Sequence, residues 1–332
     1  FYNFYNLPKY FQGLLIGKGK VEFFAKGKLD SLLSNLQLDT DRLNITYKGD
    51  LNLKKFSLVS YDGKIKLKIN NLNNFLSLSS KINLIQEANF SSDILLKNNK
   101  LNIENLDFQS ADYKYNGDIY INYHKNNKIS YDVDLFANVT SIKGIKSIYN
   151  YFILNSNLPV KGQIKLKANL FNINKLKIYN FYTLINLDEK EFYLKSLEGD
   201  LIDGTVSAQG KMSNKKEYEY KGSIELSNIN GNKLINNYFS FNKIEGDINS
   251  KVKVNGKAKN VDELFKNFNV KGEIFIKNIS IIGLDINKLI ETKNIKDLLS
   301  IDKFIIKAFN TDKKAEVNNF SINFNTNNNK IV

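Results

Sequence analysis

The side chains that could do catalytic chemistry are few in this sequence. His124 is the only histidine in 332 residues, and cysteine is absent. His124 lies between Tyr123 and Lys125 and just before two asparagines, which is typical of a solvated turn rather than of a general base. A serine triad would need this histidine, and no Gly-x-Ser-x-Gly motif precedes a helical segment. We therefore expect that the protein is not an enzyme.

The carboxylates do not form a recognisable metal or cofactor site either. Asp132 and Asp134 would share one face of a strand, and Asp188 lies close to Glu189 and Glu191. A calcium loop needs more oxygen ligands and an internal glycine, which neither place supplies. The absence of cysteine excludes thiolate sites and disulfides. We expect solvated charged faces here, with no metal and no cofactor.

The formal charge of +14 at pH 7 has two open explanations. Lys, Asn, Ile, Tyr and Phe have A/T-rich codons, so a base-biased genome would produce much of this composition. Alternatively, the lysines attract anionic lipid headgroups. Nucleic acid is not expected as a partner, because Arg42 is the only arginine and phosphate and base recognition use arginine heavily.

Alternation of apolar and polar residues is the dominant local pattern, and it predicts strands with one dry and one wet face. In residues 64–70, for example, three apolar residues alternate with Lys64, Lys66 and Lys68. The apolar residues of four such stretches are the predicted lining of an apolar face: Ile65, Leu67, Ile69; Tyr131, Val133, Leu135; Ile164, Leu166, Leu170; and Ile248, Val252, Val254.

Two recurring units add turns and short helices to these strands. The first predicts hairpin turns at Asp62-Gly63 and Asp203-Gly204, with a third copy at Asp112-Tyr113. The second places a short helix after a strand that ends in Gly-Lys, at residues 30–36 and 262–268. Further short helices are expected at residues 141–152, 231–238 and 287–299.

These elements predict a mostly β fold: an elongated, curled antiparallel sheet that forms an apolar groove, built from repeated hairpins with short amphipathic helices. We expect residues 1–190 to form a repetitive groove region and residues 191–332 to continue it. Helices this short cannot cover a long apolar face, so acyl chains of lipid are the expected occupants. Because the sequence opens at Phe1 rather than Met, we expect a fragment whose upstream membrane anchor is missing.

Residues 192–289 resemble the AsmA family of bacterial envelope proteins. The resemblance rests on a series of glycine-marked strands and one helix: Ile244-Glu245-Gly246-Asp247-Ile248, the strand to Val254-Asn255-Gly256, Val261-Asp262-Glu263-Leu264-Phe265, Val270-Lys271-Gly272-Glu273-Ile274, and Ile282-Gly283-Leu284-Asp285-Ile286. Gly246, Gly256, Gly272 and Gly283 are the structural positions that this resemblance marks.

The resemblance implies a periplasmic protein anchored to the inner membrane of a Gram-negative bacterium. It also implies a non-enzymatic conduit that carries phospholipid, or another acyl-chain lipid, between inner and outer membranes and supports outer-membrane assembly, with outer-membrane assembly proteins as further partners. The alternative is a structural scaffold or repetitive β adhesin whose sheets close a dry core. An adhesin would seal its apolar face or carry calcium loops.

Overall fold

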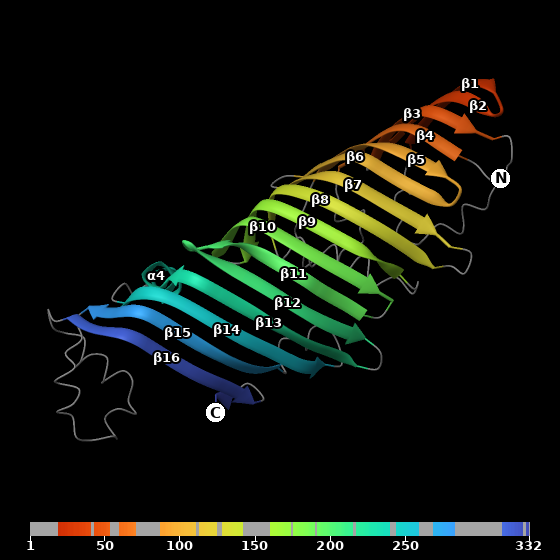
Figure 1. The fold of residues 1–332 in the computed structure, drawn as a ribbon. Coiled ribbons are helices and arrows are strands. Elements are labelled where there is room, and N and C mark those ends of the chain that lie inside the picture. Colours follow the sequence, from red (N-terminus) through yellow and green to blue (C-terminus); the bar gives the residue numbers. More distant parts are fainter. Residues whose placement is uncertain are drawn as a thin grey trace. The chain divides into compact units, whose positions relative to one another are not determined.

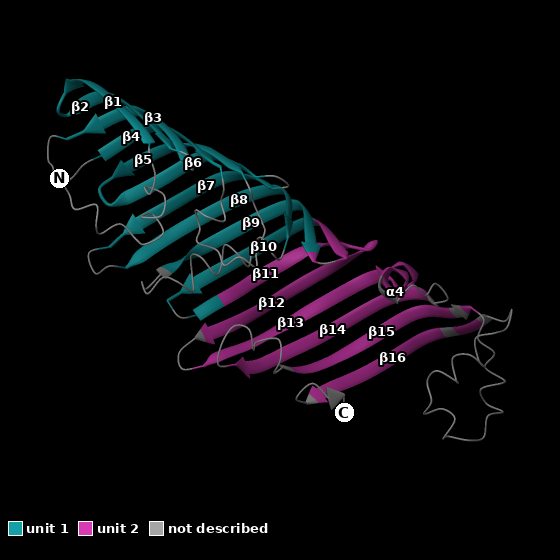
Figure 2. Cartoon of the chain, turned by 180° about the vertical axis from the view of Figure 1, so that it is seen from behind, with its two compact units in different colours: residues 1–172, 180–192 teal, residues 173–179, 193–332 magenta. Residues whose placement is uncertain are grey.

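The computed structural model describes residues 19–40, 43–53, 60–70, 87–110, 113–124, 128–141, 160–173, 175–189, 191–214, 217–239, 244–258, 268–282, 314–327 and 330–331. These residues are almost entirely strands (Figure 1). The chain divides into two compact units, coloured separately in Figure 2. Unit 1 contains residues 1–172 and 180–192, and unit 2 contains residues 173–179 and 193–332.

Unit 1 is built from consecutive strands that pair with their neighbours along the chain. They are β1 (Gly19–Lys28), β2 (Ser31–Thr40), β3 (Leu43–Asn52), β4 (Ser60–Ile69), β5 (Ala88–Lys97), β6 (Lys100–Ser110), β7 (Tyr113–Tyr123), β8 (Ile129–Ser141), β9 (Val160–Ile173) and most of β10 (Leu176–Asp188). Every pair from β1–β2 to β7–β8 is antiparallel.

The pair β8–β9 is an exception, because these two strands run parallel. Antiparallel neighbours need only a short turn, whereas parallel neighbours need a crossover of a dozen or more residues. Residues 142–159 supply a connection of that length. The prediction of a mostly antiparallel sheet is confirmed, but this one parallel pair was not predicted from the sequence.

Unit 2 continues the same pattern with antiparallel neighbours from β12 to β17. Its elements are most of β11 (Glu191–Leu201), β12 (Gly204–Asn214), β13 (Tyr218–Asn230), α4 (Gly231–Phe239), β14 (Ile244–Ala258), β15 (Phe268–Ile282), β16 (Lys314–Asn327) and β17 (Lys330–Ile331). α4 follows β13 directly and packs mainly on β14. It confirms the helix expected at residues 231–238.

The predicted helix at residues 30–36 is wrong, because these residues begin β2 and form a hairpin with β1. Leu32, Ser34 and Leu36 are less exposed than their neighbours, so the segment has the period of two that a strand requires. The other expected helices lie largely outside the described residues. Within these ranges, Ser141 ends β8 and Phe268 begins β15.

The predicted turn at Asp62-Gly63 is also wrong. Both residues lie inside β4, where Gly63 faces Gly49 of β3. A Cβ on Gly63 would lie 2.5 Å from the carbonyl oxygen of Lys48. The glycine is therefore required by the close approach of two backbones rather than by a turn.

The predicted turn at Asp203 is present, but its left-handed residues are Ile202 and Asp203, with φ of 48° and 65°. Gly204 instead begins β12, and a Cβ there would meet the carbonyl oxygen of Asn228 at 2.5 Å. Asp112, in the third copy of the repeat, lies outside the described residues.

Asparagines in left-handed backbone conformation interrupt several strands. Asn105, Asn180, Asn228 and Asn278 have φ between 49° and 54°. Shifts of strand register lie at or beside Asn105, Asn228 and Asn278. Such bulges bend a strand and increase its twist. The residue after each asparagine is an apolar residue that is at most 6% exposed: Leu106, Phe181, Ile229 and Ile279.

Candidate functional site

The candidate site is the apolar face of each unit. In unit 1 the strand register places Ile65 beside Tyr47, and Leu67 between Ile45 and Phe90. Ile69 lies between Leu43 and Ala88, and these three residues form a buried cluster. Leu67 and Ile69 therefore have apolar neighbours on both adjacent strands, whereas Ile65 has Ser92 as its neighbour on β5.

The predicted lining residues of β8 and β9 lie directly opposite one another. Val133 pairs with Ile164, and Leu135 pairs with Leu166. Tyr131 pairs with Gly162, and the absence of a side chain there leaves room for the tyrosine ring. Leu170 pairs with Val139. Two stretches that the sequence showed separately thus form one apolar strip, which continues through Ile119 of β7.

In unit 2 the predicted residues of β14 belong to a wider apolar face. Val252 lies between Ile224 and Gly272, and Val254 lies between Gly222 and Val270. Ile248 lies between Ile229 and Ile276 and is 8% exposed, at the end of the strand where Gly231 begins α4. The face extends to β16 through Ile274 and Ile322.

Ile224, Ile274 and Ile322 also belong to this face, and they were not predicted from the sequence. The same alternation that marked Val252 and Val254 is present in residues 218–226, 270–276 and 320–324. Glycines and aromatic residues interrupt these segments. Phe324, for example, lies over Gly272, so that a Cβ on that glycine would be 2.5 Å from the ring.

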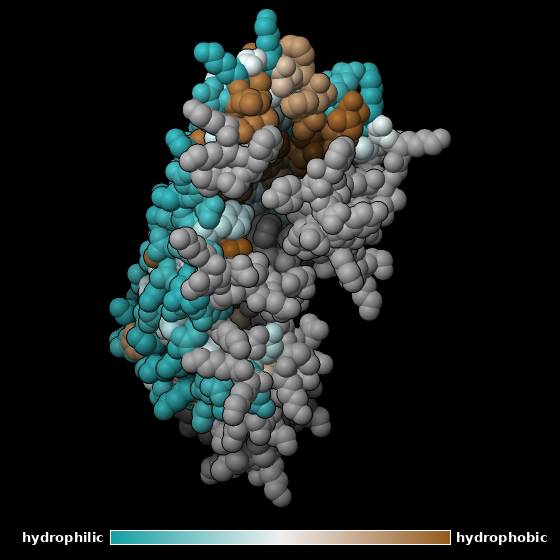
Figure 3. Space-filling model, turned by 90° about the vertical axis from the view of Figure 1, so that its right-hand side faces the viewer, coloured by the Kyte–Doolittle hydropathy of each residue, from teal (hydrophilic) through white to brown (hydrophobic). Residues whose placement is uncertain are grey.

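Exposure differs along these faces. Lining residues such as Ile65, Leu67, Val252 and Val254 are half-buried, whereas the lysines between them are mostly exposed. At the β1 edge of unit 1, Val21 and Phe23 are 63% and 60% exposed. Figure 3 shows hydrophobic side chains gathered in a hollow at the level of the first strands, with hydrophilic side chains along the opposite side. Apolar surface is therefore open to solvent on one side of these strands.

Two buried tyrosines bring polar atoms into unit 1. The hydroxyl of Tyr115 hydrogen-bonds that of Thr140 at 2.7 Å, and burial raises the pKa of Tyr115. Burial also raises the pKa of Tyr131, whose hydroxyl has no hydrogen-bond partner in the described part of the chain. These groups remain neutral at physiological pH, so they add no charge to the apolar face.

Ion pairs lie on the opposite face and involve three of the five carboxylates considered from the sequence. Asp134 lies 4.0 Å from Lys165, Asp188 lies 2.8 Å from Lys161, and Glu189 lies 3.1 Å from Lys128. All of these side chains are partly solvated. Among the described residues no cluster of three or more His, Asp or Glu could hold a metal.

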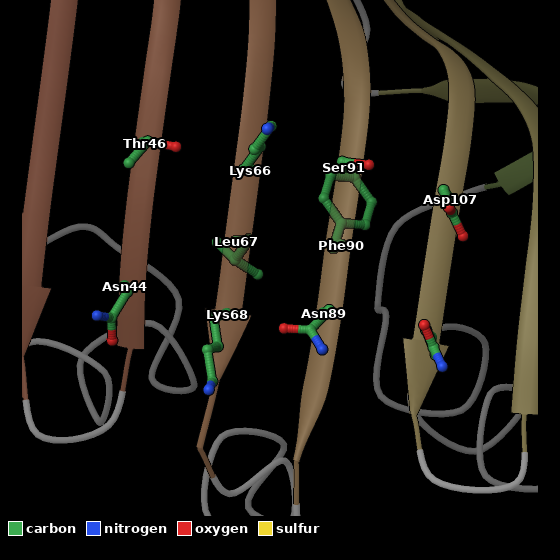
Figure 4. Close-up of a pocket in the computed structure, with 10 residues that line it drawn as sticks. Asn44, Thr46, Lys66, Leu67, Lys68, Asn89, Phe90, Ser91 and Asp107 are labelled. Atoms are coloured by element: carbon green, nitrogen blue, oxygen red, sulfur yellow. The ribbon is translucent and has the colours of Figure 1, made fainter.

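A shallow depression of about 380 Å³, lined by polar side chains and by Leu67 and Phe90, lies over β3 to β6 (Figure 4). Thr46, Lys66, Ser91 and Asp107 stand side by side on neighbouring strands. A second row runs through Lys68, which forms an ion pair with Glu87 at 2.6 Å. The depression combines amides, hydroxyls and charged groups with the apolar side chains of Leu67 and Phe90.

The remaining predicted positions have structural roles or lie outside the description. His124 is exposed, and its Nε2 lies 2.9 Å from the hydroxyl of Ser130. Gly246 has φ of 131° and lies at a bulge between β14 and β15. Gly256 and Gly272 lie within strands, and Gly283 is outside the described residues.

None of the described helices has the length and apolar character needed to cross a bilayer.

The sequence model of the AsmA family matches residues 154–331, which is more than half of the chain. The chain belongs to the AsmA family. It is thus a protein of the bacterial envelope, as the resemblance in residues 192–289 predicted, and the matched region is longer than that resemblance. No curated protein and no solved structure matches the chain. In this AsmA-family protein the match covers β9 to β17 and therefore every described strand of unit 2.

Proposed function

We propose that this AsmA-family protein binds lipid acyl chains along the apolar faces of its sheets and carries phospholipid between the inner and outer membranes. In this account it acts in the periplasm of a Gram-negative bacterium, held at the inner membrane by an anchor, and supports outer-membrane assembly without catalysing a reaction. Phospholipid, or another lipid with acyl chains, is the ligand, and outer-membrane assembly proteins are partners.

The observation that carries this proposal is the segregation of the two faces of each unit. On the register rows through Leu67 and Val252, apolar or small residues follow one another across consecutive strands. The intervening residues are mostly lysines, amides, carboxylates and hydroxyl residues. An acyl chain lying across the strands would meet apolar surface at each one, while its headgroup could remain in water.

The scaffold alternative requires sheets that close a dry core. Val21, Phe23, Ile224 and Ile322 are between 41% and 63% exposed, which a closed core would not allow. The described strands form open sheets with most residues in antiparallel hairpins. These exposures favour a surface that receives a ligand over a sealed one.

The proposal is tested by native mass spectrometry and lipid extraction of the purified protein. We expect phospholipid to co-purify with the wild type and to be lost from Val252→Asp plus Val254→Asp, because two carboxylates on the apolar face would have to be desolvated by an acyl chain. The control is Thr46→Asp plus Ser91→Asp, which adds the same charge on the polar face of unit 1, on either side of Lys66.

Circular dichroism establishes that both variants retain the β fold. Lipid loss confined to the valine variant supports the proposal. A wild type that carries no lipid and takes up no labelled phospholipid would exclude it, and so would equal lipid loss from both variants.

A further inference from the structure

Unit 2 carries a band of lysines on the face opposite the apolar one. Its members, which we call the lysine band, alternate with the apolar residues of β11 to β15: Lys195, Lys211, Lys221, Lys253 and Lys271. Lys211 lies directly opposite Lys221, and Lys253 lies directly opposite Lys271. Like charges at directly opposed positions repel each other, so this arrangement opposes sheet pairing.

The carboxylates on this face do not neutralise the band. Glu225 forms an ion pair with Lys251, and Glu219 forms one with Lys257 at 2.5 Å. Glu273 lies two residues from Lys271 on the same strand. No ion pair involves Lys221, Lys253 or Lys271 within the part of the chain that the structure describes. Positive charge therefore remains in excess across the centre of this face.

Aromatic side chains accompany the lysines. The ring of Tyr193 has the Nζ atom of Lys195 at 5.1 Å and that of Lys211 at 4.8 Å from its centroid. Phe275 lies on the same face of β15, where its neighbours across the strands are Asn249 and Ser321. Aromatic rings next to lysines are typical of surfaces that meet the headgroup region of a bilayer.

The polar face of unit 1 differs. It also has an opposed lysine pair, Lys48 and Lys64, but an opposed acidic pair, Asp50 and Asp62, is adjacent to it. Asp118 and Asp134 form a second acidic pair. Mixed signs cancel over the distance of a Debye length, about 8 Å at physiological salt. The excess positive charge is thus a property of unit 2 and not only of the overall composition.

We propose that the lysine band binds the surface of an anionic phospholipid bilayer. The charges are spread over several strands of a sheet rather than gathered in a cavity, which suits a planar array of headgroups. Lysine, a hydrated point charge, suits such an array better than it suits bidentate recognition of one group. Binding through this face leaves the apolar face of unit 2 free for acyl chains. The proposal does not require that the apolar face binds lipid.

The test is co-sedimentation of the full 332-residue chain with vesicles of phosphatidylcholine alone or mixed with phosphatidylglycerol. We expect binding only to the mixed vesicles, and weaker binding as salt increases. The triple variant Lys221→Gln, Lys253→Gln, Lys271→Gln should bind on the order of 10- to 100-fold more weakly, since each lysine near an anionic surface contributes a several-fold effect.

The matched control is Lys48→Gln, Lys66→Gln, Lys97→Gln in unit 1, which removes the same charge from described lysines. It should bind within about threefold of the wild type. Equal weakening by the two triple variants would overturn the proposal, because binding would then follow net charge alone. Absence of binding to anionic vesicles would also overturn the proposal. If the protein then bound polyglutamate instead, the result would indicate an acidic protein partner.

Discussion

At the scale of single residues, asparagine has a specific structural role in these strands. Four asparagines adopt a left-handed conformation within strands, and each is followed by a buried apolar residue. At two of them a neighbouring strand stabilises the bulge: the backbone N–H of Asn105 donates to Asp118 and that of Asn228 donates to Asn249, both at 3.0 Å. Asparagine tolerates this backbone conformation better than other residues with a side chain, except aspartate.

Substitution of Asn228 tests this role. Asn228→Gly should change the free energy of unfolding by less than about 0.5 kcal/mol, whereas Asn228→Val should lower it by about 1–2 kcal/mol, because a β-branched residue is strained at positive φ. Urea denaturation measures both values. Asn255→Val, at an exposed position of β14 without positive φ, is the control and should cost little. Equal costs for the two valine variants would contradict the bulge account.

The buried phenol of Tyr131 predicts a pH dependence of stability. Its pKa is raised by burial above the ordinary value of 10.0. The unfolded chain loses this proton near pH 10, and the folded chain loses it only at higher pH. The contribution of the neutral phenol to stability is therefore complete below pH 10 and is lost as the pH rises above 10. Tyr131→Phe should therefore lose less stability than wild type between pH 9 and pH 11 by urea denaturation, a range chosen about the unfolded pKa. Identical losses would show that Tyr131 does not titrate this way.

At the scale of strands, glycine pairs set how closely neighbouring backbones approach. Gly49 faces Gly63 in unit 1, and Gly210 faces Gly222 in unit 2. A Cβ on Gly63 would lie 2.6 Å from the Cα of Gly49, whereas one on Gly210 would lie 3.4 Å from the Cα of Gly222. The rings of Tyr47 and Tyr61 meet edge to face next to the first pair, with centroids 6.3 Å apart.

This difference predicts unequal costs for the same substitution. Gly63→Ala should lower the free energy of unfolding by about 1–3 kcal/mol, since the methyl group would force two backbones apart. Gly210→Ala should cost less than about 1 kcal/mol, because its Cβ would approach the carbonyl oxygen of Lys221 only to 3.1 Å. Thermal unfolding of the two variants compares them directly. A cost at Gly210 equal to or above that at Gly63 would refute the close-approach argument.

The sequence predicted strands better than it predicted their connections. Alternation identified the apolar residues of β4, β8, β9 and β14 because one wet and one dry face leave a local pattern. The turn at Asp62-Gly63 was wrong because glycine serves close backbone approach as well as turns. The helix at residues 30–36 was wrong because its leucines also fit a period of two. Val133 and Ile164 lie opposite each other because β8 and β9 pair in parallel. The 18 residues between the two strands separate them in the sequence, and no local pattern specifies such a pairing.

At the scale of the whole molecule, the chain has two units built by the same rule, in which successive strands add apolar residues to one face and charged residues to the other. The family match spans β9 to β17, and the open apolar faces occur in both units. The proposed function depends on the apolar face contacting acyl chains, and the proposed bilayer contact depends on the lysine band. The two proposals therefore fail or succeed separately.

The most direct test of acyl-chain binding is site-specific photo-crosslinking to radiolabelled phospholipid. A benzoylphenylalanine would replace Leu67 or Val254 on the apolar faces, and Thr46 or Lys66 on the polar face of unit 1. We expect lipid adducts at Leu67 and Val254 and few at Thr46 and Lys66. Equal labelling of the two faces, or no adduct at Leu67 and Val254 in a folded protein, would contradict acyl-chain binding.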